Sequence, residues 1–333
     1  MTTNSKHAAR ISTVIGALVA LGGAVFVATR IAGQWPEARE ALRGAAWGWL
    51  VPAILASAAG MTWFATSWRT CIRALGEDAP TRTVIGWYYL GQLGKYLPGG
   101  LWPLLGRGEM ATRSGLPRPV AYNSVALSMA VTYLAAAVAV VILLPVNASA
   151  GEGGTWWLLA AVPVGAAVLH PSVLGRLLRI AERVLGDGTH PRIPAWTTSI
   201  RLIARHLPGW AAIGLATWLV ALAFDPDAAL VPVVAAGIFS WIVGFVAVPV
   251  PGGIGVREAA FVAAAGSLAP PVAATVAVVS RLLFMVVDAG GAAVAAGPLR
   301  PRPTARADLR ADGGTDVSGS PSSAPSAPPG DDR

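Results

Sequence analysis

Long uncharged stretches alternate with short polar segments along most of the chain. Six of these stretches contain no Asp, Glu, Lys or Arg, namely Ile11–Thr29, Gly44–Trp68, Pro119–Gly151, Gly153–Gly175, Leu207–Phe224 and Ala228–Val256. A helix needs roughly 20 apolar residues to cross the hydrocarbon layer of a membrane. Together with a last apolar segment that carries two charges, the pattern predicts spans at about 11–30, 45–67, 119–144, 155–170, 209–224 and 271–297.

The composition agrees with a membrane protein. Of the 333 residues, 54% are hydrophobic and 13% are charged, whereas about a quarter of a soluble domain is charged. The first stretch follows Lys6 and Arg10, as the apolar part of a signal peptide does. Since no cleavage site of small residues follows it and Arg30 closes it, we interpret it as a retained first span.

Two Pro-Gly-Gly motifs indicate an internal repeat. The segments Gly91–Gly100 and Gly244–Gly253 align at one offset, because 251 − 98 and 244 − 91 both equal 153. Each motif is followed by an arginine and a glutamate, and the next predicted span then opens with Pro-Val-Ala. These residues are Arg107, Glu109 and Pro119 in the first half and Arg257, Glu258 and Pro271 in the second. The two halves extend over about 45–144 and 209–297.

The distribution of charge predicts how the chain is threaded. Basic loops normally stay on the cytoplasmic side. This places the N-terminus and the basic segments 69–82, 107–118, 170–208 and 300–310 inside, and the acidic or neutral turns 146–154 and 225–227 outside. All of these placements agree with one threading, in which each Pro-Gly-Gly unit enters the membrane and returns to the same face. The first unit enters from the cytoplasm and the second from outside. Only the loop 31–44, which together with the preceding Arg30 has three arginines (Arg30, Arg39 and Arg43), conflicts with this threading.

The predicted fold is therefore an all-α polytopic membrane protein with about six transmembrane helices and two re-entrant broken-helix elements in an inverted repeat. Residues 1–10 form a cytoplasmic N-terminus, residues 11–297 the transmembrane domain, and residues 298–333 a Pro/Ser/Gly-rich cytoplasmic tail that we expect to be disordered. Segment 228–250 is long enough to span fully, so the second re-entrant element has this alternative.

The net charge of +8 does not indicate a nucleic-acid partner. Residues 299–333 contain five Arg and five Asp and are neutral, so the basic excess lies between the hydrophobic stretches. We expect it to mark cytoplasmic loops at the surface of the cell membrane.

The two broken segments predict where a ligand binds. Proline and glycine interrupt a helix, and in lipid such a break survives only where protein or a water-filled cavity surrounds it. Breaks at matching positions of two halves point to a central site. The free amides expected at Gly99–Gly100 and Gly252–Gly253 suit a phosphate group.

Charged residues near the breaks extend this prediction, because charges inside a membrane are costly and mark function by default. The candidate binding residues are Lys95, Pro98, Gly99, Gly100, Arg107, Pro251, Gly252, Gly253, Arg257, Glu258, Arg281 and Asp288. Lys95 and Arg257 would contact the anion, and Glu258 would orient the arginine. Arg281 and Asp288 are seven residues apart, hence on one face of a helix about 10 Å apart.

Structural interpretations of the same residues are open. Arg257 and Glu258 would then form ion pairs that hold the loop, and Arg107 and Arg113 would extend towards the cytoplasmic surface. The spacing of Glu109 and Arg113 is that of an i,i+4 surface pair.

Other side chains offer no sign of catalysis. Cys71 is the only cysteine, and we expect His7, His170, His190 and His206 to be solvated residues of loops and termini. Trp210 and most of the 13 tryptophans fall near span ends, which is typical of an interfacial belt. We find no His/Asp/Glu constellation with useful spacing, so we expect no catalytic residue, metal or cofactor, and no enzymatic activity.

The two motifs carry a family resemblance. Lys95–Trp102, followed by Arg107, and Pro251–Glu258 resemble the lysylphosphatidylglycerol synthase transmembrane-region family over about residues 10–297. The resemblance implies a bacterial, flippase-like domain that moves lipids such as aminoacylated phosphatidylglycerol between leaflets. Some relatives also carry a soluble aminoacyltransferase or glycosyltransferase, which this sequence lacks, so we carry over neither transferase activity nor the aminoacyl substrate.

The leading hypothesis is a translocase for a phospholipid or a lipid-linked glycan, with an anionic headgroup as the group recognised. One alternative is a membrane accessory subunit of a separately encoded glycosyltransferase or synthase, which would co-purify with that partner and transport nothing alone. The other is a lipid headgroup transferase, which would form product from lipid and donor.

Overall fold

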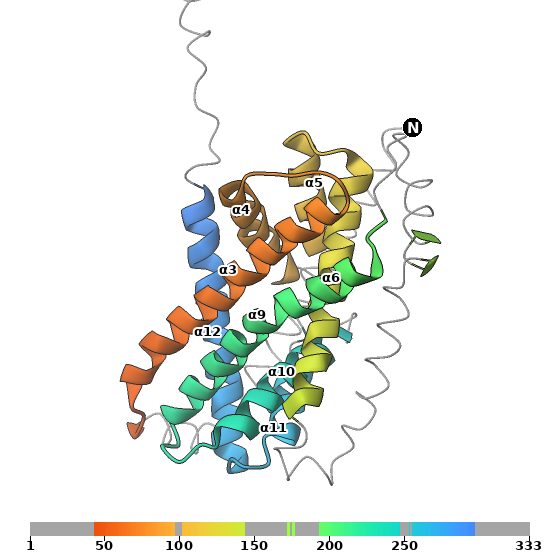
Figure 1. Cartoon of the computed structure of the whole chain (residues 1–333). Helices are drawn as coiled ribbons and strands as arrows, with labels where there is room; N and C mark the ends of the chain where they lie inside the picture. Colours follow the sequence, from red (N-terminus) through yellow and green to blue (C-terminus); the bar gives the residue numbers. More distant parts are fainter. Residues whose placement is uncertain are drawn as a thin grey trace, which may run out of the picture. The chain divides into compact units, whose positions relative to one another are not determined.

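The computed structural model describes residues 43–96, 102–143, 172–173, 175–176, 193–246, 253 and 255–296. Throughout these ranges the regular secondary structure is helical (Figure 1). The predicted spans 11–30 and 155–170, the outside turn 146–154 and the terminal segments lie outside the described residues.

Four helices of each half follow one another in the same order. In the first half these are α3 (Leu50–Ala74), which follows the 3-10 helix η1 (Trp47–Trp49), then α4 (Thr81–Gln92), α5 (Trp102–Arg113) and α6 (Arg118–Leu143). In the second half they are α9 (Trp196–Leu222), α10 (Leu230–Val246), α11 (Val256–Ala264) and α12 (Pro270–Ala296). A further 3-10 helix, η2 (Leu93–Tyr96), continues α4 towards the first Pro-Gly-Gly motif. The helices α6 and α12 begin and end within one residue of the predicted spans.

Helix α9 begins well before the predicted start at residue 209. The segment up to Pro208 was expected to be a basic loop, and this expectation is wrong, because α9 starts at Trp196 and contains Pro208. Neighbouring α3 contacts the helix at this point: Trp63 Nε1 donates a hydrogen bond of 2.6 Å to the carbonyl of Arg205, in the turn before the proline. In the first turns of α9, Ser199, Leu202 and His206 are buried and Arg201 and Arg205 are exposed.

The crossing of α3 and α9 forms much of the core. A Cβ atom on Gly60 would lie 3.1 Å from the carbonyl oxygen of Gly209, so the two backbones approach closely there. Phe64 packs edge-on against Trp210 with 5.2 Å between the ring centroids. Trp210 is only 2% exposed and donates a hydrogen bond to the carbonyl of Thr132. Its predicted place in an interfacial belt is therefore wrong.

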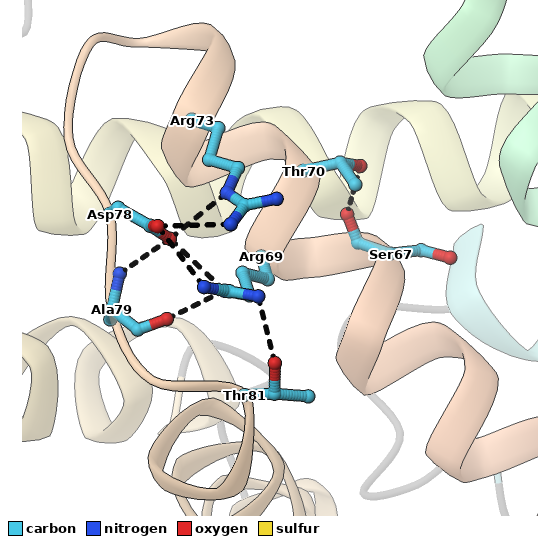
Figure 2. A network of polar contacts seen from close by, with 7 residues as sticks. All are labelled: Ser67, Arg69, Thr70, Arg73, Asp78, Ala79 and Thr81. Carbon is cyan, nitrogen blue, oxygen red and sulfur yellow. Dashed lines mark hydrogen bonds and ion pairs between the residues drawn. The ribbon is translucent and has the colours of Figure 1, made fainter.

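A compact polar network closes the turn between α3 and α4 (Figure 2). The Asp78 carboxylate accepts hydrogen bonds from Arg69 and Arg73, at 3.0 Å from each nearest nitrogen. Arg69 also donates to the carbonyl of Ala79 and to the hydroxyl of Thr81. The hydrogen bond from Arg73, together with the amide of Ala79 and Arg69, lowers the pKa of Asp78 to about 2. The network fixes where α4 begins.

Three described helices are long and apolar enough to cross a membrane, at Trp47–Ala74, Arg118–Leu143 and Pro270–Ala296. Helix α10 is apolar but has 17 residues, about 25 Å at 1.5 Å per residue. This is shorter than the hydrocarbon layer of about 30 Å. The described part is that of a membrane protein, while six spans and two re-entrant elements stay a prediction.

Helix α12 connects the two broken units. It packs against α4 of the first half and against α11 of the second. In Figure 1, α4 and α5 lie towards one end of α12, and α10 and α11 lie towards its other end. Arg281 and Phe284, which lie between the two ends of α12, line the candidate site.

Candidate functional site: a basic cavity between the two broken helices

A cavity of about 240 Å³ lies among the helices of both halves. Its wall is largely aromatic and apolar, with Phe64, Tyr88, Tyr133, Trp210, Trp241 and Phe284 among its members. Four basic residues also line it, Lys95, Arg107, Arg257 and Arg281, and none of the described lining residues is Asp or Glu. All four were candidates in the sequence.

Lys95 at the end of η2 is tied to α12. Its Nζ lies 2.6 Å from Oδ2 of Asp288, whose side chain is fully buried. The hydroxyl of Tyr96 donates a hydrogen bond of 2.7 Å to the same oxygen. The Lys95 ammonium also lies 5.2 Å from the centroid of the Trp241 ring. Asp288 thus balances the charge of Lys95 from behind the cavity wall.

Arg281 on α12 is paired in the same way with Glu258 on α11. The second oxygen of the Glu258 carboxylate accepts a hydrogen bond of 2.7 Å from the amide of Gly255 and so caps the start of α11. The expectation that Glu258 orients Arg257 is wrong, because its carboxylate is bound to Arg281 and Gly255. Arg281 and Asp288, although on one helix, bind different halves of the protein.

Arg107 on α5 is buried, with 5% of its surface exposed, so the alternative that it extends to the membrane surface is wrong. Its guanidinium carbon lies 4.5 Å from the centroid of the Tyr88 ring. Nη2 donates to the side-chain oxygen of Gln92 at 3.3 Å, whereas Nε has no hydrogen-bond partner among the described residues. The Glu109–Arg113 surface pair is confirmed, at 2.8 Å.

Arg257 on α11 has surroundings similar to those of Arg107. Its guanidinium carbon lies 3.7 Å from the centroid of the Trp241 ring and 5.2 Å from that of Phe284. As with Arg107, no described carboxylate lies within ion-pair distance of it. Two arginines of the cavity are therefore held by aromatic rings rather than by acids.

A glycine makes room for each of these arginines. A Cβ atom on Gly91 would collide with the side chain of Arg107, and one on Gly244 would lie 3.1 Å from Cβ of Arg257. Gly253 packs on the backbone of Gly244 with φ of +65°, so a side chain there would be strained and would find no space. Gly91 and Gly244, which align in the two motifs, thus have the same structural role. Each lets the chain after the break approach the helix before it.

The structure brings together most of the predicted site. Lys95, Arg107, Gly253, Arg257 and Arg281 line the cavity, and Glu258 and Asp288 each bind one of its cations. Pro98, Gly99, Gly100, Pro251 and Gly252 lie outside the described residues. Sequence reasoning missed the aromatic wall and Tyr96, although Tyr96 directly follows Lys95 in the first motif.

The charges of the cavity favour an anion. Burying an ion costs several kcal/mol unless it is paired, and a cation–π contact returns only about 0.5–2 kcal/mol. Arg107 and Arg257 have such contacts but no carboxylate partner in the described part of the chain. An anionic group bound between them would gain charge-assisted hydrogen bonds.

Within the described ranges, no group of three or more His, Cys, Asp or Glu side chains is placed to hold a metal ion.

His206, expected to be a solvated loop residue, is instead buried in α9, where its Nδ1 lies 2.6 Å from the carbonyl oxygen of Leu202. That expectation is wrong because the helix starts earlier than predicted and turns this face towards α3.

Comparison with known proteins identifies the family of the chain. No curated protein matches the chain. The family profile described as "Lysylphosphatidylglycerol synthase TM region" matches residues 13–289, the part that contains both motifs and the cavity. The chain therefore belongs to the lysylphosphatidylglycerol synthase transmembrane-region family, and it is a membrane protein of lipid metabolism or transport.

Proposed function

We propose that the protein is a lipid translocase that binds an anionic headgroup in the basic cavity and moves the lipid between leaflets. The observation that carries the proposal is the cavity itself, which has four basic lining residues and no described acidic one, in a member of a lipid-related membrane family. The headgroup phosphate contacts Arg107 and Arg257, and the acyl chains stay in the bilayer. The protein carries out no chemical step.

The arrangement of the two halves supports a path across the membrane. Lys95 comes from the segment before the first break and Arg257 from the helix after the second, yet both line one cavity. The two broken units pack towards opposite ends of α12 (Figure 1). In the proposal each unit is re-entrant, the halves have opposite orientations in the cell membrane, and each break opens the cavity towards one leaflet in turn.

Transport by the purified full-length chain tests the proposal. Proteoliposomes would contain a phosphatidylglycerol labelled with a fluorophore on an acyl chain, and an impermeant quencher would report which fraction reaches the outer leaflet. We expect fast quenching beyond half of the signal, and its loss in the Arg107→Gln/Arg257→Gln double variant. Because Arg113 is exposed on the same helix as Arg107, Arg113→Gln serves as the matched control and should transport normally.

The same experiment separates the alternatives. Transport by the protein alone argues against an accessory subunit that works only with a glycosyltransferase. If neither phosphatidylglycerol nor any other phospholipid or polyprenyl lipid is moved by the well-folded protein, the translocase proposal fails.

A further inference from the structure

The charge balance of the cavity restricts which headgroups can be bound there. We infer that the preferred headgroup carries two negative charges on phosphate, as in a lipid phosphomonoester or diphosphate. This inference rests on the proposed function and names the substrate class of the same site. It follows from the two arginines of the cavity that have no carboxylate partner among the described residues.

The charge count does not depend on protonation inside the ion pairs. Lys95 with Asp288, and Arg281 with Glu258, each sum to zero whether the proton is on the base or has moved to the acid. The aromatic rings beside the cavity are neutral. Within the described residues, the cavity and its ion-pair partners therefore carry an excess of two positive charges, those of Arg107 and Arg257.

These two charges act on the same space. Arg107 and Arg257 both line the cavity, as does Tyr133. One arginine comes from each half, and each is backed by an aromatic ring, Tyr88 or Trp241. Nε of Arg107 is buried without a partner among the described residues, so a donor is left for a ligand.

Common headgroups differ in how well they balance this excess. A phosphodiester such as phosphatidylglycerol brings one negative charge and leaves one guanidinium group uncompensated. A lysyl ester of the same lipid adds two ammonium groups, which would repel both arginines. A phosphomonoester or a diphosphate brings about two charges, and its oxygens can accept hydrogen bonds from a guanidinium group in the bidentate geometry.

A pair of lipids that differ by one charge tests the inference. Binding of dioleoylphosphatidic acid and of its methyl ester, dioleoylphosphatidylmethanol, would be measured at pH 8 with the purified full-length chain in detergent, by native mass spectrometry. The methyl ester keeps the phosphate and acyl chains but has only one negative charge. We expect phosphatidic acid to bind at least tenfold more tightly than the methyl ester or phosphatidylglycerol.

Single arginine variants should remove the preference and not all of the binding. In Arg257→Gln, phosphatidic acid should bind about as weakly as the methyl ester binds to the wild type, and Arg107→Gln should behave alike. Arg113→Gln should keep the full preference. Arg107 is buried, so its variant can fold poorly, whereas Arg257 is half-buried. The comparison of the lipids on the wild type needs no variant at all.

Three outcomes would contradict the inference. Equal binding of phosphatidic acid and its methyl ester, abolished in the double variant, would overturn the two-charge headgroup but leave the proposed function in place. Binding of no lipid would overturn both. If inorganic phosphate competes with phosphatidic acid at the same molar concentration, the phosphate group that the site binds need not come from a lipid, and the inference of a lipid headgroup fails.

Discussion

Asp288 is the residue on which the charge balance of the cavity depends most. It is fully buried in α12, one of its oxygens contacts Lys95 and Tyr96, and the other has no hydrogen-bond partner among the described residues. Removing one partner of a buried ion pair leaves the other charge uncompensated, which costs more than the pair itself contributes. The Lys95 ammonium would then be a third uncompensated cation at the cavity.

We expect Asp288→Asn to destabilise the protein by about 3–5 kcal/mol, the usual cost of breaking a buried pair. Adding Lys95→Met should restore most of this loss, because the double variant buries no uncompensated charge. The measurement is the thermal unfolding midpoint of the single and double variants in one detergent. Glu109→Gln, which breaks the exposed pair with Arg113, should cost at most about 1 kcal/mol. Additive effects of the two changes would show that Lys95 and Asp288 do not interact.

The charged residues of the site could be predicted from the sequence, but their pairing could not. Charge inside apolar segments is costly, and this principle found Lys95, Arg257 and Asp288. Glu258 binds Arg281, 23 residues further along the chain, instead of its neighbour Arg257. That choice depends on how α11 packs on α12, for which the sequence pattern has no signal.

At the scale of elements, the contact of α4 with α12 depends on one glycine. The ring of Tyr89 on α4 lies directly over Gly291, where a Cβ atom would overlap it, whereas a Cβ atom on neighbouring Gly290 would meet nothing within 4 Å. Tyr89 has little freedom to move, because its hydroxyl is hydrogen bonded to Thr62 and to the carbonyl of Ala58. The contact brings α12, with Asp288, beside the first half.

We therefore expect Gly291→Ala to lower the stability by about 1–3 kcal/mol through overpacking. Gly290→Ala, the matched control, should be neutral or should stabilise the helix by up to about 1 kcal/mol. Thermal unfolding of both variants in the same detergent checks this. Equal midpoints for the two alanine variants would show that Tyr89 moves aside without cost.

The turn between α3 and α4 should respond to acid (Figure 2). The folded protein lowers the pKa of Asp78 from 3.8 to about 2, first through the hydrogen bond from Arg73. A lowered folded pKa means that the stabilisation is complete above the unfolded value and is lost as the pH falls from about 3.8 towards 2. The unfolding midpoint of the wild type should thus exceed that of Asp78→Asn at pH 5, and the difference should vanish near pH 2. A difference independent of pH would contradict an ionised Asp78 as its source.

The boundaries of a helix could be predicted where charged residues end the helix. They could not be predicted where charged residues lie on the helix itself. The spans that became α6 and α12 could be read from apolar length. The start of α9 could not, because Arg201 and Arg205 lie on its exposed face while Leu202 and His206 are buried. A search for uncharged stretches counts such an amphipathic first part as loop.

At the scale of the whole molecule, the repeat is the feature on which most of the proposed function depends. The helices of each half occur in one order, and each half contributes one aromatic-backed arginine to one cavity. The sequence predicted the repeat from its Pro-Gly-Gly motifs. The opposite orientation of the halves is predicted from the charge of the loops alone. A basic loop predicts the side of the membrane on which it lies, but it gives no information on the helices between the loops.

Two serines at matching positions allow a direct test of that orientation. Ser114 follows α5 and Ser267 follows α11, both are exposed, and they differ by the offset of the repeat, 267 − 114 = 153. Cys71 is the only cysteine of the chain and is buried, so the unmodified protein provides a low background for thiol labelling. If the second half is inverted, the turn at Ser267 faces outside and the turn at Ser114 faces the cytoplasm.

In intact cells, an impermeant maleimide should therefore label the Ser267→Cys variant at once and the Ser114→Cys variant only after the membrane is permeabilised. Denatured samples of both variants should label equally, which controls for expression and for thiol reactivity. Labelling of both from one face would mean that the halves share one orientation. The cavity would then have both breaks towards one leaflet, and the two arginines would serve a binding site without a path to the other side.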